Sequence, residues 1–581
     1  MSYFKKNIES VIFLLQEDKK KIPYIYFLIL IVSILDIVGI GLVGPIVGFI
    51  LSEGQTNAEI LNSFEYLNII NFSNDNLFLY LSIGLILVFF FKMLIGIYSI
   101  FVMQKFSLYR ATSIVTTLTE SALSAPYIEH VDKNNSEIIS NIERYSYIFG
   151  SLMFQLLKTI SDTTVILFLS IFMFLSSPIL TTSIFAFCFS LGLIYAFVFK
   201  GRLFNYGEKS VAALQKLVKS IIEAMNGYKE IKTLSIEKYI RDEITQSSKD
   251  LSDAYIKQSV ISAWPRLFLE FAFICLVVLA LQIIYSLNID FIKIAPLIVM
   301  FMYLAARMIP LFTNLMHLVF LFNFHMPAIR ILEDSVKYSR HFDKETKKLH
   351  LPSFENIRFE NISFSYNLKS TNEILNNVSF DINKNEIVGI SGESGSGKST
   401  LLNILLGFLK PNQGLIYYNG KEINDDINMI KSKIFYIPQD SFFIDDTIEK
   451  NIALGMRAAD IDKELINFSI EKVGLKEFLQ SQEKGSETII GQNGVKISGG
   501  QKQRLSLARS FYHKRDIVIL DESTNALDVK NEKRIIDEIK RLSVEKTFII
   551  VSHQKTILAI CDKILSINNG LLNVKHNNLK K

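Results

Sequence analysis

The stretch "GESGSGKS", residues 392–399, decides the fold of the C-terminal part of this 581-residue chain. It follows the apolar run 387–390 and precedes a helical pattern at 401–408, so a strand, a glycine-rich loop and a helix follow one another. The spacing fits G-x-x-x-x-G-K-[ST], whose glycines let backbone N–H groups converge on phosphate oxygens while the helix directs its positive end at them. The sequence therefore predicts a phosphate-binding loop, and this setting disfavours the alternative of a chance Gly/Ser loop.

The polar residues at the end of this loop have separate expected roles. We expect Lys398 to reach the β- and γ-phosphates and the Ser399 hydroxyl to ligate Mg²⁺. The predicted nucleotide-binding residues of the loop are Gly392, Glu393, Ser394, Gly395, Ser396, Gly397, Lys398, Ser399 and Thr400.

Two carboxylates end another apolar run in the same part of the chain. Residues 517–520 predict a buried strand that ends in Asp521 and Glu522. We expect Asp521 to position the metal and Glu522 to polarise the attacking water as general base. Alone the pair is a weak signal, but together with the phosphate loop it indicates nucleotide hydrolysis.

The pattern around these motifs predicts a soluble α/β domain over residues 353–581. Apolar residues alternate at Ile357, Phe359, Ile362 and Phe364, and strands then alternate with helices to the last residue. A polar linker is expected at residues 326–352.

The first 325 residues have a different character, because they hold apolar runs long enough to cross a bilayer, about 20 residues or more each. The formal net charge of +5 is weak for a chain of this length, which does not indicate nucleic-acid binding. Six membrane spans are predicted, at about residues 24–51, 77–103, 151–176, 179–199, 262–285 and 292–322.

Basic residues between the spans predict their orientation. Lys19, Lys20 and Lys21 precede the first span, and the segments after the second and fourth spans are long and rich in Lys and Arg, so these are expected in the cytoplasm. The segment 52–76 has no Lys or Arg and is expected outside, as are the turn at 176–178 and the connection near Asn288. Apolar spacing at 60–67 fits a short amphipathic helix on the outer surface, with a packed loop as the alternative. Breaks at 125–126 and 226–227 indicate helices that run past the bilayer, turn and return.

The cysteine spacing argues against a metal site and a disulfide framework, and the N-terminus argues against a cleaved signal peptide. Cys188, Cys275 and Cys561 show neither metal-ligand nor disulfide-framework spacing, and we expect free buried thiols. No short apolar core with a small-residue cleavage site follows the amphipathic N-terminus, so the first span is expected to direct insertion itself.

The segment "KISGGQKQR", residues 496–504, does not by itself indicate a catalytic function, because two glycines before a helix also fit a simple helix cap. Combined with Gln439, the 521–522 pair and His553 after a second apolar strand, it makes the chain resemble the ATP-binding-cassette family over its whole length. The fold class that this resemblance implies is a membrane α-helical six-span exporter domain fused to a soluble α/β P-loop ATPase domain, with long helices extending into the cytoplasm.

The resemblance also implies roles for individual residues. Tyr366 resembles the aromatic residue that stacks on adenine, Gln439 the residue that senses Mg²⁺ and the membrane domain, and His553 the switch that contacts the γ-phosphate. The family signature, which binds the phosphate of the nucleotide held by the opposite subunit, corresponds to Ser498, Gly499, Gly500 and Gln501. One such cassette on one chain implies a head-to-tail homodimer with two composite ATP sites. Ile497 replaces the usual Leu, and Asn525 the usual Ser, but neither change removes a catalytic group.

Basic residues inside the spans bear on the substrate, because a charge there is costly and usually faces a cavity or a partner. At a rise of about 1.5 Å per residue, Lys92, Arg266 and Arg307 lie at similar depth in the cytoplasmic half. One interpretation is a cationic belt that holds an anionic group, because the basic residues outnumber their obvious partners. The structural alternatives are an Arg266–Glu270 pair, a Lys92 that snorkels, an Arg266 already in water, and partial neutralisation by Asp36 and Asp162.

The spans resemble one subgroup of the family, the flippases for lipid-linked oligosaccharides used in bacterial protein N-glycosylation. The matching segments are "PRLFLE" at 265–270, "ARMIP" at 306–310, the outward segment near 60–67, and Lys92, where Arg is usual. This resemblance implies that Lys92, Arg266 and Arg307 contact a pyrophosphate and that the outward helix engages a polyprenyl tail. It also implies the bacterial cytoplasmic membrane, with the N-terminus and the cassette in the cytoplasm. The alternatives are an exporter of drugs, peptides or other glycolipids, and an ATP-gated channel or sensor, against which Glu522 and His553 argue.

Overall fold

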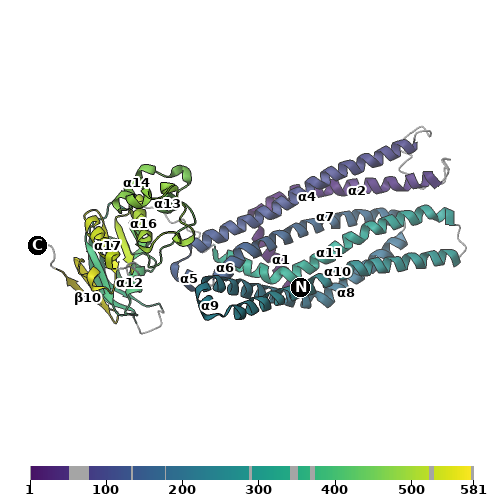
Figure 1. Ribbon diagram of the computed structural model, residues 1–581. Coiled ribbons are helices and arrows are strands. Elements are labelled where there is room, and N and C mark those ends of the chain that lie inside the picture. The colour runs from purple at the N-terminus through teal and green to yellow at the C-terminus, as the bar shows by residue number, and fades with distance from the viewer. Residues whose placement is uncertain are drawn as a thin grey trace. The chain divides into compact units, whose positions relative to one another are not determined.

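The computed structural model describes residues 2–51, 77–132, 135–176, 178–286, 291–339, 351–366, 373–522 and 529–577. The chain forms two compact units (Figure 1). The first comprises Met1–Ala125 and His130–Lys344, and the second comprises Pro126–Glu129 and Glu345–Lys581. The predicted outward segment 52–76, Ser177 and Asn288 lie outside the described residues.

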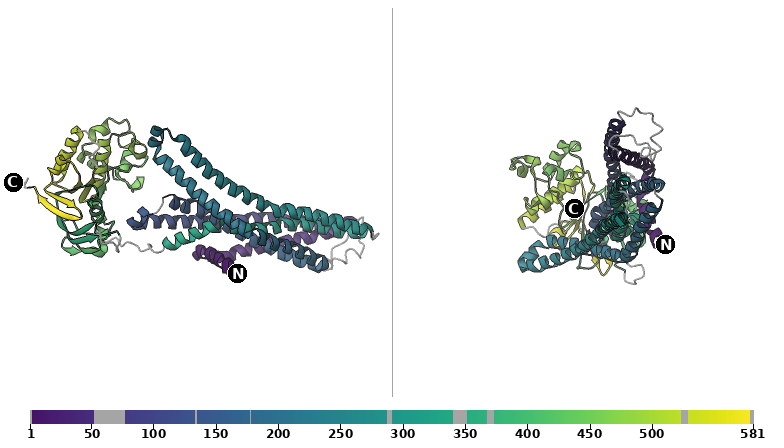
Figure 2. Two further views of the ribbon diagram at one scale, coloured as in Figure 1. Left: turned by 90° about the horizontal axis from the view of Figure 1, so that it is seen from below. Right: turned by 90° about the vertical axis from the view of Figure 1, so that its right-hand side faces the viewer.

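Long helices that pack side by side build the first unit (Figure 2). Four of them contain 48 to 50 residues, which at about 1.5 Å per residue is about two and a half times the thickness of a bilayer core. The helices are α1 (Ser2–Leu15), α2 (Ile22–Leu51), α4 (Leu77–Ser124), α5 (Tyr127–Asp132), α6 (Asn135–Ile139), α7 (Ser146–Ser176), α8 (Pro178–Asn226), α9 (Tyr228–Leu234), α10 (Glu237–Ser286) and α11 (Phe291–Ser339), with a 3-10 turn at Gln16–Lys21 and a π-helix, η4, at Ser140–Tyr145.

The helix boundaries confirm the two predicted breaks and correct the predicted linker. α4 ends at Ser124 before Pro126, and α8 ends at Asn226 before Gly227. The expectation of a polar linker from residue 326 is wrong for 326–339, which continue α11. The reason is an apolar stripe at helical spacing, in which Met326, Ile329 and Leu332 are fully buried.

Within the described residues, five helices are long and apolar enough to cross a membrane. They cover parts of α2, α4, α7, α10 and α11. The predicted span at 179–199 lies in α8, where many side chains are outside the description, and it stays a prediction. Of the cysteines, Cys561 is buried and free as expected, whereas Cys275 is exposed.

The second unit contains two sheets. A four-stranded sheet has the order β2-β1-β4-β5, and a six-stranded sheet has the order β10-β9-β3-β8-β7-β6, in which all neighbours except β10 and β9 pair parallel. The strands are β1 (Asn356–Phe364), β2 (Leu375–Asn383), β3 (Ile387–Gly392), β4 (Gln413–Tyr418), β5 (Lys421–Glu422), β6 (Ile434–Ile437), β7 (Ile517–Asp521), β8 (Thr547–Val551), β9 (Lys563–Asn568) and β10 (Leu571–His576).

Alternation along the central strands builds two cores on opposite faces of the parallel sheet. Ile549 and Val551 of β8 belong to the core shared with the antiparallel sheet and α12 (Lys398–Leu405), whereas Phe548 and Ile550 belong to the core under the helices of the other face. These helices are α13 (Ile448–Ile452), α14 (Lys463–Lys472), α15 (Lys476–Gln480), α16 (Gly499–Tyr512), α17 (Val529–Leu542) and α18 (Lys555–Leu558).

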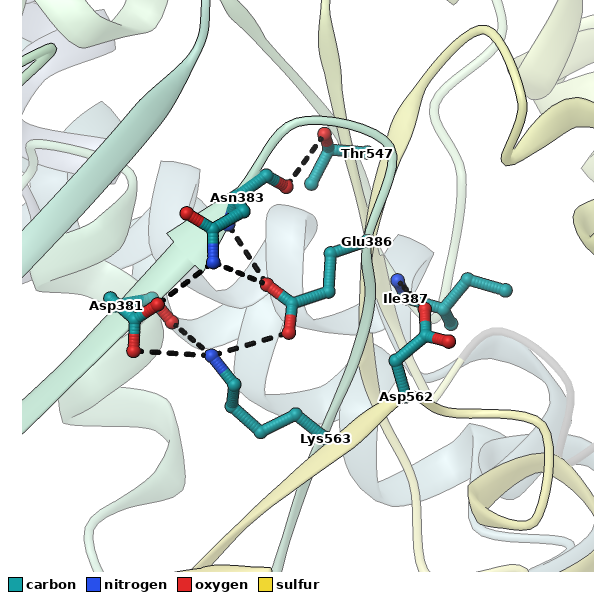
Figure 3. A network of polar contacts seen from close by, with 7 residues as sticks. All are labelled: Asp381, Asn383, Glu386, Ile387, Thr547, Asp562 and Lys563. Carbon is teal, nitrogen blue, oxygen red and sulfur yellow. Dashed lines mark hydrogen bonds and ion pairs between the residues drawn. The ribbon is translucent and has the colours of Figure 1, made fainter. Parts of the chain in front are cut away.

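A buried lysine ties the two sheets together at the amino end of β3 (Figure 3). Lys563 is 2% exposed, and its Nζ lies 3.2 Å from Asp381 Oδ1 and 3.2 Å from Glu386 Oε1. Asn383 donates through its backbone N–H to Glu386 Oε2, and Ile387 donates to Asp562 Oδ2. Lys563 thus pairs with a carboxylate of β2 and one that precedes β3, so this network joins the two sheets, and it lies at the opposite end of β3 from Gly392.

Candidate functional site

The predicted site residues gather at one edge of the parallel sheet. β3, β8, β7 and β6 are successive parallel neighbours, so their carboxyl ends lie at the same edge, where ligands bind in open α/β sheets. The glycine-rich loop follows β3, Glu522 follows β7, His553 follows β8, and Gln439 lies two residues after β6. The topology thereby brings together segments that are up to 160 residues apart in sequence, about the separation of Gly392 and His553.

The loop after β3 requires glycine where the backbone turns. Gly392, Gly395 and Gly397 have φ of 154°, 80° and 107°, a region that residues with a Cβ rarely adopt. A Cβ at Gly392 would lie 2.3 Å from the Ile567 carbonyl oxygen, which no side chain permits. The loop therefore curls in the manner that the motif predicts, and α12 begins at Lys398 with its first N–H groups directed at the space above the loop.

The polar atoms of this loop fit a phosphate ligand. Lys398 is 9% exposed, and its Nζ donates to the carbonyl oxygens of Gly392 and Glu393, each at 2.8 Å. The buried Ser396 Oγ has no hydrogen-bond partner among the described residues. An ammonium held over the loop by two neutral acceptors is free to exchange them for phosphate oxygens, which bind it more strongly.

Asp521 and Glu522 occupy different environments, as their separate expected roles require. Asp521 Oδ2 accepts a hydrogen bond of 2.8 Å from the Tyr436 hydroxyl, and burial raises the pKa of Asp521, while this bond lowers it. Glu522 has φ of 45°, and its Oε1 lies 3.5 Å from His553 Nε2. The strained backbone of Glu522 holds its carboxylate beside the histidine at the end of the next strand.

The remaining predicted residues lie where their roles require solvent access. Gln439 is exposed, and Tyr366 is 56% exposed with its ring edge-to-face against Phe364. Ser498 caps α16: its Oγ accepts from the Gln501 N–H, and Gln501 Oε1 accepts from the Ser498 N–H at 2.8 Å. The helix cap is therefore confirmed. That residues 498–501 bind the phosphate of a nucleotide held by a second subunit stays a prediction. Residues 525–528 lie outside the described residues.

Sequence reasoning missed two supporting groups. Tyr436, which orients Asp521, is the third residue of β6, and only the pairing of β6 with β7 places it there. Arg509 of α16 is buried, and its Nε donates at 2.7 Å to the carbonyl of Asn451, whose side-chain oxygen accepts from Ile444 N. Burial lowers the pKa of Arg509 to about 10. These hydrogen bonds hold the segment that follows Gln439 against α16, the helix that Ser498 caps.

In the first unit, one buried carboxylate pairs with two of the three basic residues that were predicted to bind substrate. Asp36 of α2 is 3% exposed and accepts from Lys92 of α4 and from Arg307 Nη2 of α11, at 2.9 and 3.1 Å for the two arginine contacts. Lys92 and Arg307 thus share one carboxylate, so these two cations outnumber their partner, as expected. One carboxylate against two cations leaves a formal excess of one positive charge.

The third cation is paired on its own helix. Arg266 Nε lies 2.8 Å from Glu270 Oε1 one turn along α10, as the structural alternative predicted. The Arg266 side chain is 71% exposed. Asp162 accepts from Asn314 Nδ2 at 2.8 Å. The structure thus brings Lys92 and Arg307 together at Asp36 and leaves Arg266 on a separate, exposed pair.

Comparison with known proteins matches both units. Residues 22–311 fit the model of the ABC transporter transmembrane region, and residues 375–525 fit that of the ABC transporter. A relative in Haemophilus influenzae, described as an ABC transporter ATP-binding/permease protein, is 32% identical over 60% of this chain and 62% of its own length. One in Bacillus subtilis, described as a multidrug export ATP-binding/permease protein, is 36% identical over 37% of each chain.

The Kluyveromyces lactis mitochondrial protein named as an iron-sulfur clusters transporter is 38% identical over 38% of this chain and 30% of its own length. The chain thus spans less than two thirds of the length of these relatives. A solved bacterial Atm1-family ABC exporter with ATP bound has the same fold, with a TM-score of 0.71 and 19% identity over 96% of this chain and 95% of that chain.

This fold match confirms the predicted fold class. With one model on each unit and the nucleotide site formed at the strand ends, the chain belongs to the ABC transporters, as a half-transporter in which a helical transmembrane region of the exporter type is fused to one nucleotide-binding cassette.

Proposed function

We propose that the cassette hydrolyses ATP and that hydrolysis drives export across the bacterial cytoplasmic membrane. The observation that carries the hydrolytic part is the Glu522–His553 contact of 3.5 Å at the edge where the phosphate loop also lies. Glu522 acts as general base by taking a proton from the attacking water through a carboxylate oxygen. His553 orients that carboxylate and contacts the γ-phosphate, while Lys398 transfers its hydrogen bonds from the loop carbonyls to the phosphate oxygens.

The residues present fit a Mg²⁺ ion that accompanies the nucleotide. Ser399 supplies a hydroxyl at the start of α12, Gln439 a side-chain oxygen, and Asp521 a carboxylate oriented by Tyr436. The ion, when bound, neutralises part of the phosphate charge. Tyr436 keeps one oxygen of Asp521 engaged and leaves the other for this role.

We propose a homodimer with two composite sites, in which residues 498–501 of one copy complete the site above the other copy's loop. The support is the position of this segment at the N-terminus of the 14-residue helix α16, whose positive end and capped backbone suit a phosphate group. The N-terminus and the cassette are proposed to lie in the cytoplasm, with the predicted outward segment on the other side.

The proposed cargo is a polyprenyl-pyrophosphate-linked oligosaccharide, flipped from the inner to the outer leaflet. The charge set of Asp36, Lys92 and Arg307 supports an anionic group, because it retains one excess positive charge on three packed helices. A pyrophosphate would compete with Asp36 for Arg307, whose planar guanidinium pairs with phosphate as it does with carboxylate. Arg266, which is exposed and pairs with Glu270 among the described residues, is the second proposed contact.

The experiment is reconstituted flipping in proteoliposomes, with a polyprenyl-pyrophosphate-linked oligosaccharide compared with neutral drugs. Replacing both Arg266 and Arg307 by Gln is expected to abolish flipping of the pyrophosphate lipid while basal ATPase activity persists. The matched control is Arg241→Gln, on the part of α10 that precedes the span predicted at residues 262–285. Transport that survives the double change removes the pyrophosphate contact from the proposal.

A second candidate is an exporter of drugs, peptides or other glycolipids. Its support is that each predicted substrate cation already has a carboxylate partner, so most of the positive charge is neutralised within the protein. Neutral drugs moving at the expense of ATP, with the pyrophosphate lipid inert in the same vesicles, would favour this candidate.

A further inference from the structure

Three helices of the cassette are joined at the place where α14 ends. Gly474 follows this helix with φ of 65°, and its N–H donates to the Glu471 carbonyl at 3.2 Å. This left-handed turn commonly ends a helix and favours glycine. The last carbonyl groups of a helix carry partial negative charge, so cationic side chains are expected to bind there.

Two arginines from neighbouring helices bind this helix end. Arg504 of α16 donates through Nη1 to the Gly474 carbonyl at 3.1 Å, and Arg541 of α17 donates through Nη2 to the Lys472 carbonyl. Arg504 Nε also lies 3.4 Å from the Gly500 carbonyl, a longer contact than the first. Because Gly500 belongs to the segment predicted to bind the phosphate of a second nucleotide, Arg504 connects that segment to the end of α14.

One carboxylate faces the same turn. The Glu538 side chain of α17 is 12% exposed, and its Oε1 lies 3.9 Å from Arg541 Nη2. A Cβ at Gly474 would lie 3.3 Å from the same Oε1, so the carboxylate lies directly against the turn whose carbonyl Arg504 binds. The ends of α14, α16 and α17 thus meet around Glu538.

The charges around Glu538 determine what its ionisation does. Burial raises the pKa of Glu538 to about 7, although Arg504 and Arg541 lower it. Lys472, the basic residue at the end of α14, is paired instead with Glu545 at 2.5 Å. An ionised Glu538 therefore attracts Arg504 and Arg541, whereas below a pH of about 7 it gains a proton and loses this attraction.

We propose that Arg504 and Glu538 position the phosphate-binding segment 498–501. Arg504 binds the Gly500 carbonyl and the end of α14 at the same time, and the Glu538 carboxylate holds the guanidinium there. Neither residue contacts the nucleotide, and both act through the segment at the start of α16. The inference rests on the proposed role of residues 498–501 toward a second nucleotide and adds the groups that hold them in place.

Steady-state ATP turnover of the full chain in lipid nanodiscs, measured across pH, tests this inference. Wild-type turnover should fall as the pH drops through about 7, where Glu538 gains its proton. Glu538→Gln cannot gain this proton, so it should lack that fall. Above this pH its turnover should be about fivefold below wild type, since coupling energies within one contact network are of that size. ATP binding should persist, because Lys398 and the phosphate loop are unchanged.

Arg504→Gln should lower turnover at least as much as Glu538→Gln. The double variant should be no slower than Arg504→Gln alone, because Glu538 acts through Arg504. The matched control is Asp537→Asn, since Asp537 precedes Glu538 on α17 but is exposed, and it should keep the wild-type rate and pH profile. Glu538→Gln keeps the size of the side chain, so it is expected to fold even if Arg504→Gln does not.

Ser498→Ala, measured alongside, separates this inference from the proposed function. If Ser498→Ala lowers turnover while Glu538→Gln keeps the wild-type rate and pH profile, the positioning role is overturned and the role of residues 498–501 stands. If Ser498→Ala turns over ATP at the wild-type rate, both are overturned. A double variant whose loss is the product of the two single losses would contradict the action of Glu538 through Arg504.

Discussion

The nucleotide site of the cassette and the charged cluster of the transmembrane region both bury ionised side chains, but they satisfy them differently. Among the described residues Lys398 donates to neutral carbonyls of its own loop, whereas Asp36 accepts from cations on two other helices. The first arrangement leaves a charge ready for a ligand, and the second neutralises the buried Asp36 carboxylate within the protein. A charged side chain whose partners a ligand can replace indicates a binding site, whereas one paired within the protein stabilises the fold. Each prediction below tests which of these roles a residue has.

The largest expected effect is at Glu522. Glu522→Gln removes the general base but keeps the size of the side chain, and ATP turnover should fall by about 100- to 1,000-fold. ATP binding should persist, because Lys398 and the loop are unchanged. Steady-state hydrolysis and nucleotide binding on the same preparation check this. Glu545→Gln is the control, since Glu545 pairs with Lys472 on the surface; unchanged turnover in Glu522→Gln would remove Glu522 from the role of base.

The next largest effect compares Asp36 and Glu270, two carboxylates of the transmembrane region that pair with basic residues. Asp36→Asn leaves Lys92 and Arg307 without their shared anion and should destabilise the fold by about 3 kcal/mol, the lower end of the range for a broken buried ion pair, because Arg307 is 39% exposed. Glu270→Gln breaks an exposed i,i+4 pair and should cost less than about 1 kcal/mol. Thermal unfolding in detergent measures both. Equal losses of stability in the two variants would contradict a stabilising role for the buried Asp36.

A smaller effect separates the cap from the proposed signature at Ser498. Ser498→Ala should cost about 1 kcal/mol of stability, as should Asp462→Ala at the cap of α14, where Asp462 accepts from the Leu465 N–H. Only Ser498→Ala is expected to lower ATP turnover, by about tenfold, because it also touches phosphate in a composite site. If both variants hydrolyse ATP alike, residues 498–501 are a cap alone.

The smallest effect concerns Tyr436. Burial raises the pKa of Asp521, and the hydrogen bond from Tyr436 opposes this, so Tyr436→Phe should raise the pKa of Asp521 further. Because the ionised carboxylate attracts the metal, ATPase activity should be lost at a higher pH on acidification than in wild type. The pH profile of turnover measures the shift. Tyr418→Phe, which loses a bond to the Pro352 carbonyl, should leave the profile in place.

The same contrast explains what the sequence could predict. The phosphate loop, Asp521, Glu522 and His553 each follow an apolar strand, and parallel pairing then brings them to one edge, so local patterns sufficed. The Arg266–Glu270 pair was also accessible, because a spacing of four on a helix places side chains together.

Contacts between distant residues were not accessible from the sequence. Asp36 lies 56 residues from Lys92 and 271 from Arg307, and only the packing of three helices brings them together. Tyr436 and Arg509 likewise act on residues far along the chain. The continuation of α11 past residue 326 was missed because charged residues, Arg330, Glu333, Asp334 and Lys337, stand between the apolar residues of its buried stripe.

The measurement that tests the central claim most directly is transport by Glu522→Gln in the same proteoliposomes as wild type, with ATP hydrolysis recorded in parallel. If hydrolysis at the strand ends of the cassette drives export, transport and hydrolysis should fall together to the background of vesicles without protein. Transport that continues at the wild-type rate while hydrolysis is abolished would contradict the account.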